Sequence, residues 1–134
     1  MTAYESKVLI DSSVWIKYFK EGDRKLETLI SEDLISTNEL ILTEIVPVLL
    51  KQKQEELVDL LMTIDCIPLK INWMLLRQYQ LINLNNGINK VGIPDLIILQ
   101  QVIETKVSFF SLDDHFRLMN KHLIFDLVSD QPDL

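Results

Sequence analysis

The sequence predicts an α/β protein with a mainly parallel central sheet, and three patterns support this class. Short apolar runs alternate with longer segments whose apolar residues recur at helical spacing. The first run, residues 8–10, is continuous, which is typical of a strand buried on both faces of a parallel sheet. A chain of 134 residues with 48% hydrophobic content can bury one core, so we expect a single domain over residues 1–134.

Strands are expected where a short apolar run is bounded by turn or capping residues. After the first strand, residues 34–36 and 66–69 offer a second and a third, and Pro68 favours a sheet edge for the latter. Further strands are expected at 107–110 and 123–125, which gives a sheet of about five strands. The polar tail beyond them need not be ordered.

Helices are expected between these strands. The first follows Asp11, where Ser12 or Ser13 can cap it. A second pattern at 39–54 contains Pro47, which should kink the helix unless it falls in the first turn. The other helical patterns cover residues 24–33, 55–64, 73–84, 95–103 and a short stretch through Phe116 and Met119.

Composition and charge exclude several classes of protein. The twenty acidic and thirteen basic residues give a net charge of −7. This is the wrong sign for a protein that binds nucleic acid mainly through contacts of Lys and Arg with the phosphates. A polyanionic substrate would therefore need a metal ion or a local basic patch. The single cysteine, Cys66, permits no intramolecular disulfide. The sequence begins with no recognisable signal peptide and has no apolar stretch near the roughly 20 residues of a membrane helix, so we expect a cytoplasmic protein.

Four carboxylates occupy positions that this fold can bring together. Asp11 and Asp113 each follow a short apolar strand, and parallel strands end at one edge of the sheet, where α/β proteins place their ligands. Asp95 opens a helix, and Glu44 lies on the helix after the second strand, so both can reach that edge. Carboxylates this close repel one another, and a hard divalent cation such as Mg²⁺ or Mn²⁺ relieves the repulsion.

Each acid also has a purely structural interpretation. Asp11, taken alone, is equally well explained as a strand-end acid near a helix cap. Asp95 in a first helical turn complements the helix dipole, which stabilises by about 0.3 to 1 kcal/mol. Glu44 has the weakest such explanation, because burying an unpaired carboxylate in an apolar run is costly. Of the adjacent Asp113 and Asp114, we expect the first in the pocket and the second as a solvated helix cap.

Four short motifs occur in order along the chain: L-I-D-S-S-V-W-I, L-T-E-I, G-I-P-D-L-I-I-L and F-F-S-L-D-D-H-F. Together they resemble PIN-domain proteins, above all the ribonuclease toxins of VapBC toxin–antitoxin pairs, over residues 8 to about 116. The resemblance implies a three-layer α/β/α PIN-like domain with a Mg²⁺- or Mn²⁺-dependent acidic quartet that cleaves RNA. The implied quartet is Asp11, Glu44, Asp95 and Asp113. In this interpretation Ser12 and Ser111 hold supporting hydroxyl positions beside the acids.

The resemblance also implies a reaction and a partner. A metal-activated water would hydrolyse the RNA phosphodiester and leave a 5′-phosphate and a 3′-hydroxyl. A VapB-like antitoxin would cover the acidic pocket with its C-terminal segment, in a toxin–antitoxin hetero-oligomer or around a toxin homodimer. Trp15, Ile16 and Tyr18 of the first helix are candidates to receive an antitoxin helix.

Two places depart from the family pattern. Many relatives have a further acid where this chain has His115, which leaves the number of metal ions open. We expect His115 in a solvated loop near the site. Leu99 and Gln100 replace small residues after the third acid, and this change concerns helix packing more than chemistry.

Two other functions fit the sequence less well. A response-regulator-like phosphoacceptor domain needs an acidic pair before the first helix and a lysine after a late strand. This chain has Ser12 and Ser13 beside Asp11 and no well-placed lysine. A non-catalytic interaction module with the same fold would not need four acids, and an activity assay separates it from the nuclease.

Overall fold

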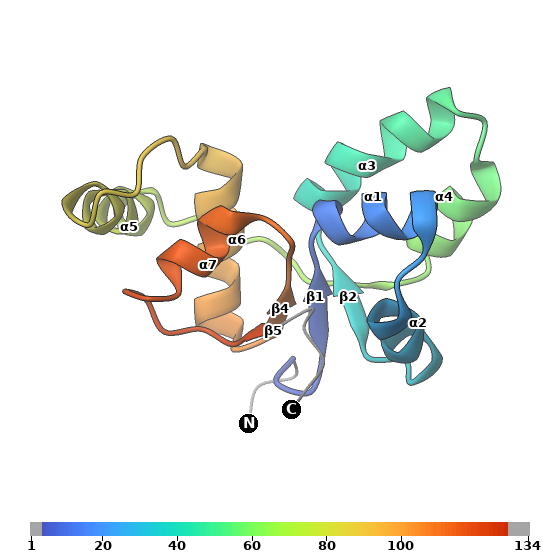
Figure 1. The fold of residues 1–134 in the computed structure, drawn as a ribbon, viewed down its shortest axis with the longest axis horizontal. Coiled ribbons are helices and arrows are strands. Elements are labelled where there is room, and N and C mark those ends of the chain that lie inside the picture. The colour runs from blue at the N-terminus through green and yellow to red at the C-terminus, as the bar shows by residue number, and fades with distance from the viewer. Residues whose placement is uncertain (1–3, 129–134) are drawn as a thin grey trace.

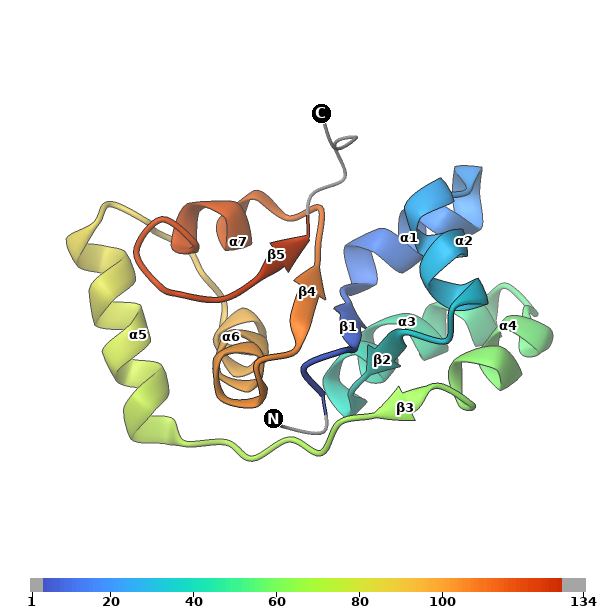
Figure 2. The same cartoon turned by 90° about the horizontal axis from the view of Figure 1, so that it is seen from below.

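The computed structural model describes residues 4–128 and arranges them around a parallel sheet of five strands (Figures 1 and 2). All neighbouring strands pair in parallel, as predicted. The strands lie in the order β3 (Asp65–Cys66), β2 (Ile35–Thr37), β1 (Val8–Ile10), β4 (Ser108–Phe110) and β5 (Leu127–Val128). The expected polar tail lies largely outside the described residues.

Helices flank the sheet and complete the predicted three layers. In both views the first four helices lie to one side of β1 and the last three lie to the other (Figures 1 and 2). The helices are α1 (Ser12–Glu21), α2 (Arg24–Ser31), α3 (Glu39–Lys51), α4 (Glu55–Leu61), α5 (Trp73–Asn85), α6 (Ile93–Thr105) and α7 (Asp114–Met119). Their limits agree with the predicted limits to within one helical turn. Within residues 4–128, no helix is long and apolar enough to cross a bilayer.

The central strands form the most buried part of the molecule. Leu9, Ile10, Phe109 and Phe110 are 0% exposed, because β1 and β4 are covered on both faces. Phe109 also packs edge to face against Phe116, with ring centroids 4.7 Å apart. This contact holds α7 against β4 and so fixes the helix that follows the end of that strand.

The start of α1 differs from the prediction. Asp11 occupies the cap position, while Ser12 and Ser13 lie in the first turn of the helix. Asp11 makes no side-chain capping bond to the helix backbone, and the Ser13 hydroxyl donates to its Oδ2 at 2.7 Å. The beginning of α1 therefore positions three polar side chains instead of using a serine as its cap.

Helix α3 begins as predicted and runs through Pro47. Asn38 caps it by accepting a hydrogen bond from the backbone N–H of Ile41 at 2.8 Å. The helix ends at Lys51, short of the predicted limit at residue 54, because Lys53 adopts the left-handed conformation with φ of 59°.

The edge strands are where the predicted boundaries were wrong. The third strand pairs only over Asp65–Cys66 rather than 66–69, although its edge position is confirmed. The last strand is Leu127–Val128 rather than 123–125. The predicted segment is apolar, but Ile124 is 95% exposed, and the Phe125 carbonyl accepts a hydrogen bond from the side chain of Asn120.

Two buried glutamines of α6 fasten the chain that follows β3. Gln100 donates to the Lys70 carbonyl at 2.7 Å. The side-chain amide of Gln101 donates to the carbonyls of Ile67 and Pro68, which follow β3, at 3.1 and 3.2 Å. Its oxygen accepts a hydrogen bond from the Asn38 side chain at 2.7 Å. Gln100, which was expected to concern helix packing more than chemistry, thus forms hydrogen bonds with the segment that leads to α5.

One of the three residues expected to receive a partner helix is unavailable. Trp15 is 0% exposed and stacks on Phe19 inside the core. Ile16 is 46% exposed, and Tyr18 is half-buried. The apolar pattern of α1 in the sequence did not show which of its apolar residues face the core and which face the solvent.

Candidate metal centre

Asp11 lies directly after β1 and is buried, with only 5% of its surface exposed. Its Oδ2 accepts hydrogen bonds from the hydroxyls of Ser13 and Ser111, each at 2.7 Å. Burial raises the pKa of Asp11 above its ordinary value, while the bonds from Ser111 and Ser13 act in the opposite direction. The carboxylate is thus held in one orientation in a place where its charge is costly.

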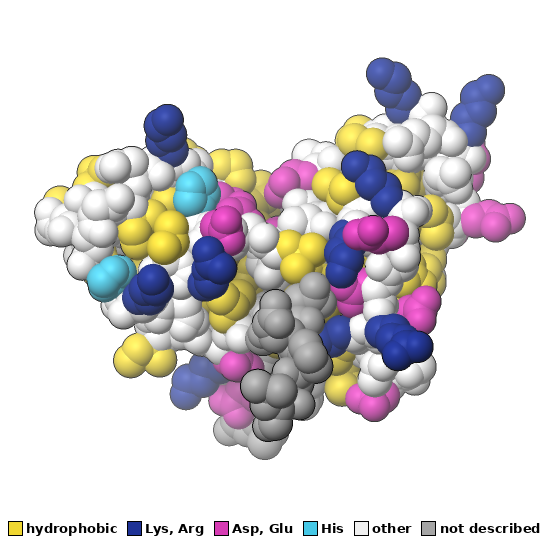
Figure 3. Space-filling view, in the orientation of Figure 1, with side chains coloured by type: hydrophobic (Ala, Val, Ile, Leu, Met, Phe, Trp, Pro, Cys, Tyr) yellow, Lys and Arg dark blue, Asp and Glu magenta, His cyan; other side chains and the backbone are white. Residues whose placement is uncertain are grey.

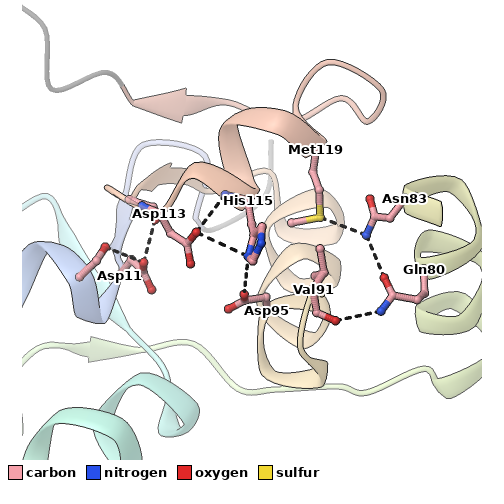
Figure 4. Close-up of polar contacts among 10 residues, drawn as sticks. Asp11, Gln80, Asn83, Val91, Asp95, Asp113, His115 and Met119 are labelled. Carbon is pink, nitrogen blue, oxygen red and sulfur yellow. Dashed lines mark hydrogen bonds and ion pairs between the residues drawn. The ribbon is translucent and has the colours of Figure 1, made fainter. Parts of the chain in front are cut away.

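Ser111 connects the ends of β4 and β1. Besides donating to Asp11, its Oγ accepts the backbone N–H of Asp113 at 3.0 Å. The backbone N–H of Leu112 donates to the Ser13 hydroxyl at 3.1 Å. Figure 4 shows the result, in which Asp113 lies beside Asp11 at the carboxyl edge of the sheet.

Asp113 caps α7 and also faces the other acids. Its Oδ1 accepts the backbone N–H of His115 at 2.9 Å. The prediction gave the capping role to Asp114, but that side chain is exposed and pairs with Arg117 at 3.1 Å. A single residue therefore starts the helix and supplies a carboxylate to the site.

Asp95 lies in the first turn of α6, opposite Asp113 (Figure 4). Burial is the largest cause that raises its pKa from 3.8 to about 6, and the charges of Asp113 and Asp11 follow. The positive character of His115 lowers this pKa, and the charge of Glu44 raises it further. Because all three other acids act on Asp95, the four charges share one region of space.

Glu44 reaches the site from α3. Its Oε2 accepts a hydrogen bond from the Ser12 hydroxyl at 3.2 Å. Desolvation raises its pKa, and the charge of Asp11 adds to this effect. The residue is nevertheless exposed, so the argument that Glu44 must be functional because its burial is costly was wrong. Its contact with Ser12 is what connects it to the site.

His115 lies between two of the acids, not in a solvated loop as expected. It occupies the first turn of α7, and its side chain is 34% exposed. Its Nδ1 is 3.8 Å from Asp95 Oδ2 and 3.7 Å from Asp113 Oδ1. The sequence held a signal for this placement, since a residue two positions after a capping aspartate lies in a first helical turn, beside the cap.

The residues at this edge are suited to hold a divalent cation. Asp95, Asp113 and His115 each offer a ligand atom, and these atoms lie within 4.8 Å of one another. Asp11 and Glu44 are close enough for their charges to raise the pKa of Asp95. Oxygen-rich sets of this kind suit hard divalent ions, and a bound cation would relieve the repulsion that raises these pKa values.

Fold and site together define a class: a three-layer α/β domain with acids that follow β1 and β4 and acids on α3 and α6, gathered at the carboxyl edge of a parallel sheet. The family model for the PIN domain matches residues 8–121. The chain belongs to the PIN domain family, and the resemblance inferred from its motifs is confirmed.

Three solved structures of toxin–antitoxin complexes are similar to this chain in fold. VapBC2 from Rickettsia felis, bound to a promoter DNA fragment, has a TM-score of 0.70 and 13% identity, covering 90% of this chain and 96% of that chain. DNA-bound VapBC from Salmonella typhimurium has a TM-score of 0.73 and 11% identity, covering 93% and 98%. A toxin–antitoxin complex from Klebsiella pneumoniae has a TM-score of 0.65 and 16% identity, covering 93% and 98%. At these identities the likeness is one of fold. No curated protein matches the sequence.

Proposed function

We propose that this chain is a metal-dependent endoribonuclease and the toxin of a toxin–antitoxin pair. One observation carries the proposal: Asp11, Glu44, Asp95 and Asp113 come from four separate elements, yet each of the other three charges raises the pKa of Asp95. Such a concentration of carboxylates is unfavourable without a cation, and the cap that Asp113 makes on α7 does not require the other three acids. Membership of the PIN family supports a nuclease.

In this proposal the four acids share Mg²⁺ or Mn²⁺. When bound, the ion supplies the positive charge that a phosphodiester requires and makes water more acidic. Ser13 and Ser111 keep the Asp11 carboxylate in one orientation, and Ser12 does the same for Glu44. Attack by water, rather than by the neighbouring 2′-hydroxyl, leaves a 5′-phosphate and a 3′-hydroxyl.

The shape of the surface is suited to a nucleic-acid strand. Figure 3 shows acidic side chains and a histidine beside a hollow between the two helical halves, with Lys and Arg side chains on both sides. Because the net charge is −7, cations at the rim and a metal in the hollow would have to attract the phosphates. We propose that the protein acts in the cytoplasm, where cellular RNA is available as a substrate.

The proposed antitoxin has a suitable binding place between α1 and α3. A groove of about 250 Å³ lies there, and its exposed apolar side chains include Ile16 at 46% and Val48 at 53%. Glu44 lines the same groove, so a segment seated in it reaches the acidic site. An apolar segment that also carries a basic side chain would cover the groove and neutralise the acids. The toxin–antitoxin complexes among the structural neighbours support such a partner.

Parallel expression of the wild type and Asp11→Asn tests the proposed function. The wild type should arrest growth and fragment cellular RNA, whereas the variant, expressed to the same level, should do neither. Circular dichroism of both purified proteins checks that the variant is folded. Equal toxicity of the two proteins would remove the nuclease assignment.

A further inference from the structure

The ligand atoms at the candidate metal centre include one nitrogen. Nδ1 of His115 lies 3.8 Å from Asp95 Oδ2 and 3.7 Å from Asp113 Oδ1. Both separations exceed the roughly 2.7 to 3.2 Å of an N–H···O hydrogen bond, so the ring is not bonded directly to either acid. One ligand atom from each of the three residues lies within 4.8 Å of the other two, and Figure 4 shows the His115 ring between the carboxylates of Asp95 and Asp113.

The two separations from His115 Nδ1 are short enough for ligands of one ion. Atoms that each bind one cation at roughly 2.1 Å cannot lie more than about 4.2 Å apart. The distances from Nδ1 of His115 to Asp95 and to Asp113 both fall below that limit. The imidazole therefore needs little movement to share a cation with both carboxylates.

The main chain that carries the imidazole is held in place. The N–H of His115 donates to Asp113 Oδ1 at 2.9 Å, so the residue is tied to one of its proposed fellow ligands. The next residue, Phe116, is 1% exposed and packs against Phe109 of β4. A ligand supported by a buried neighbour loses little freedom on binding, which favours a site of fixed geometry.

We propose that His115 is a metal ligand together with Asp95 and Asp113, and that the centre prefers Mn²⁺ to Mg²⁺. This inference rests on the proposed metal-dependent function and specifies its ion. Mg²⁺ takes oxygen ligands and gives up its waters reluctantly, whereas imidazole nitrogen binds first-row transition ions more readily. A purely carboxylate centre would show this preference less strongly.

Pulsed electron paramagnetic resonance of bound Mn²⁺ tests the ligand directly. The wild type, freed of metal and reloaded with Mn²⁺, should show ¹⁴N modulation from a coordinated imidazole. His115→Asp keeps an oxygen ligand and should lose that modulation, whereas His122→Asn alters an exposed histidine and should keep it. Bound Mn²⁺ without ¹⁴N modulation in the wild type, or unchanged modulation in His115→Asp, overturns the inference.

Competition between the two ions tests the preference. Mg²⁺ titrated into the Mn²⁺-loaded protein should displace Mn²⁺ at least about tenfold more easily from His115→Asp than from the wild type. His115→Gln serves as a second variant if His115→Asp fails to fold, as judged by circular dichroism. An identical ratio of Mn²⁺ to Mg²⁺ affinity in wild type and variant overturns the preference.

Measuring RNA cleavage on the same samples separates this inference from the proposed function. RNA cleavage with Mn²⁺ bound through oxygen alone rejects the histidine ligand and leaves the nuclease standing. Nitrogen-ligated Mn²⁺ in a protein that never cleaves RNA supports the ligand and rejects the nuclease. Failure of the wild type to bind Mn²⁺ overturns the proposal that His115 is a metal ligand. Continued RNA cleavage in EDTA overturns the proposal that cleavage depends on a metal.

Discussion

The hydroxyl of Ser111 donates a 2.7 Å hydrogen bond to the carboxylate of Asp11, a residue 100 positions away in the sequence. β1 and β4 are adjacent parallel strands, so the bond forms where both strands end. The same oxygen accepts the backbone N–H of Asp113 at 3.0 Å. The Ser111 side chain therefore fixes the positions of Asp11 and Asp113 relative to each other.

Replacing Ser111 with alanine should impair the site more than the fold. Ser111→Ala removes the strongest hydrogen bond that lowers the pKa of Asp11, so this pKa should rise further. If cleavage needs the charged carboxylate, the acidic limb of the pH–rate profile should move to higher pH, with about tenfold lower kcat/KM near neutrality. Ser31→Ala removes an exposed hydroxyl of α2 and should leave the profile unchanged. An unshifted limb in Ser111→Ala would contradict the role given to this hydrogen bond.

Neutralising Asp95 should stabilise the metal-free protein at neutral pH. The pKa of Asp95 is raised from 3.8 to about 6, so the folded state binds this proton more tightly than the unfolded chain. Its contribution to stability is full below about pH 4 and is lost as the pH rises through about 6. Because the side chain is 27% exposed, we expect Asp95→Asn to gain only about 1 to 2 kcal/mol at pH 7 in EDTA.

Urea unfolding of Asp95→Asn and wild type at about pH 4 and about pH 7 measures this difference. The two curves should lie closest together at the lower pH. Divalent ions should then raise the unfolding midpoint of the wild type more than that of the variant. A variant no more stable than the wild type at neutral pH would contradict the raised pKa of Asp95 and the unfavourable burial of its charge beside the other acids.

Changing the groove between α1 and α3 should weaken binding of the proposed antitoxin. Val48→Asp places a charge at an apolar position that is 53% exposed, so an apolar antitoxin segment should bind at least about tenfold more weakly. Growth rescue by the co-expressed antitoxin should then fail. Leu81→Asp makes the same change on α5, where Leu81 is 58% exposed, and rescue should persist. Equal rescue of both variants would place the antitoxin elsewhere.

The buried amide of Gln101 should matter for stability rather than for chemistry. Gln101→Ala leaves the Asn38 amide and the two carbonyls after β3 without their partner and opens a cavity beside α6. We expect a loss of about 2 to 4 kcal/mol in the free energy of unfolding, measured by urea titration. Gln78→Ala on the exposed face of α5 should cost little. A small loss in Gln101→Ala would mean that water or neighbouring groups replace these hydrogen bonds.

The sequence predicted the central strands and most of the helices because their apolar patterns reflect burial directly. The last strand was misplaced because its position depends on pairing rather than on apolar content. The Phe109 N–H donates to the Asp126 carbonyl at 2.8 Å and sets the strand at Leu127–Val128. Nothing local distinguishes this pair from the more apolar residues 123–125.

Two of the four acids could be predicted from topology alone. Asp11 and Asp113 follow strands that a parallel sheet ends at one edge. Asp95 and Glu44 lie on helices that can reach that edge, but topology alone does not fix which acid of a helix faces it, and the motif resemblance supported these two. The position of His115 was missed because it depends on which of two adjacent aspartates caps α7. The sequence analysis gave the cap to Asp114, whereas Asp113 caps the helix in the structure and so places His115 in its first turn.

The most direct test of the nuclease account is cleavage of end-labelled RNA by the purified protein, followed by identification of the new ends. We predict 5′-phosphate and 3′-hydroxyl products in Mn²⁺ or Mg²⁺, no cleavage in EDTA, and at least about a hundredfold lower rate for Asp11→Asn. Products ending in 2′,3′-cyclic phosphate, or undiminished cleavage by Asp11→Asn, would contradict the account.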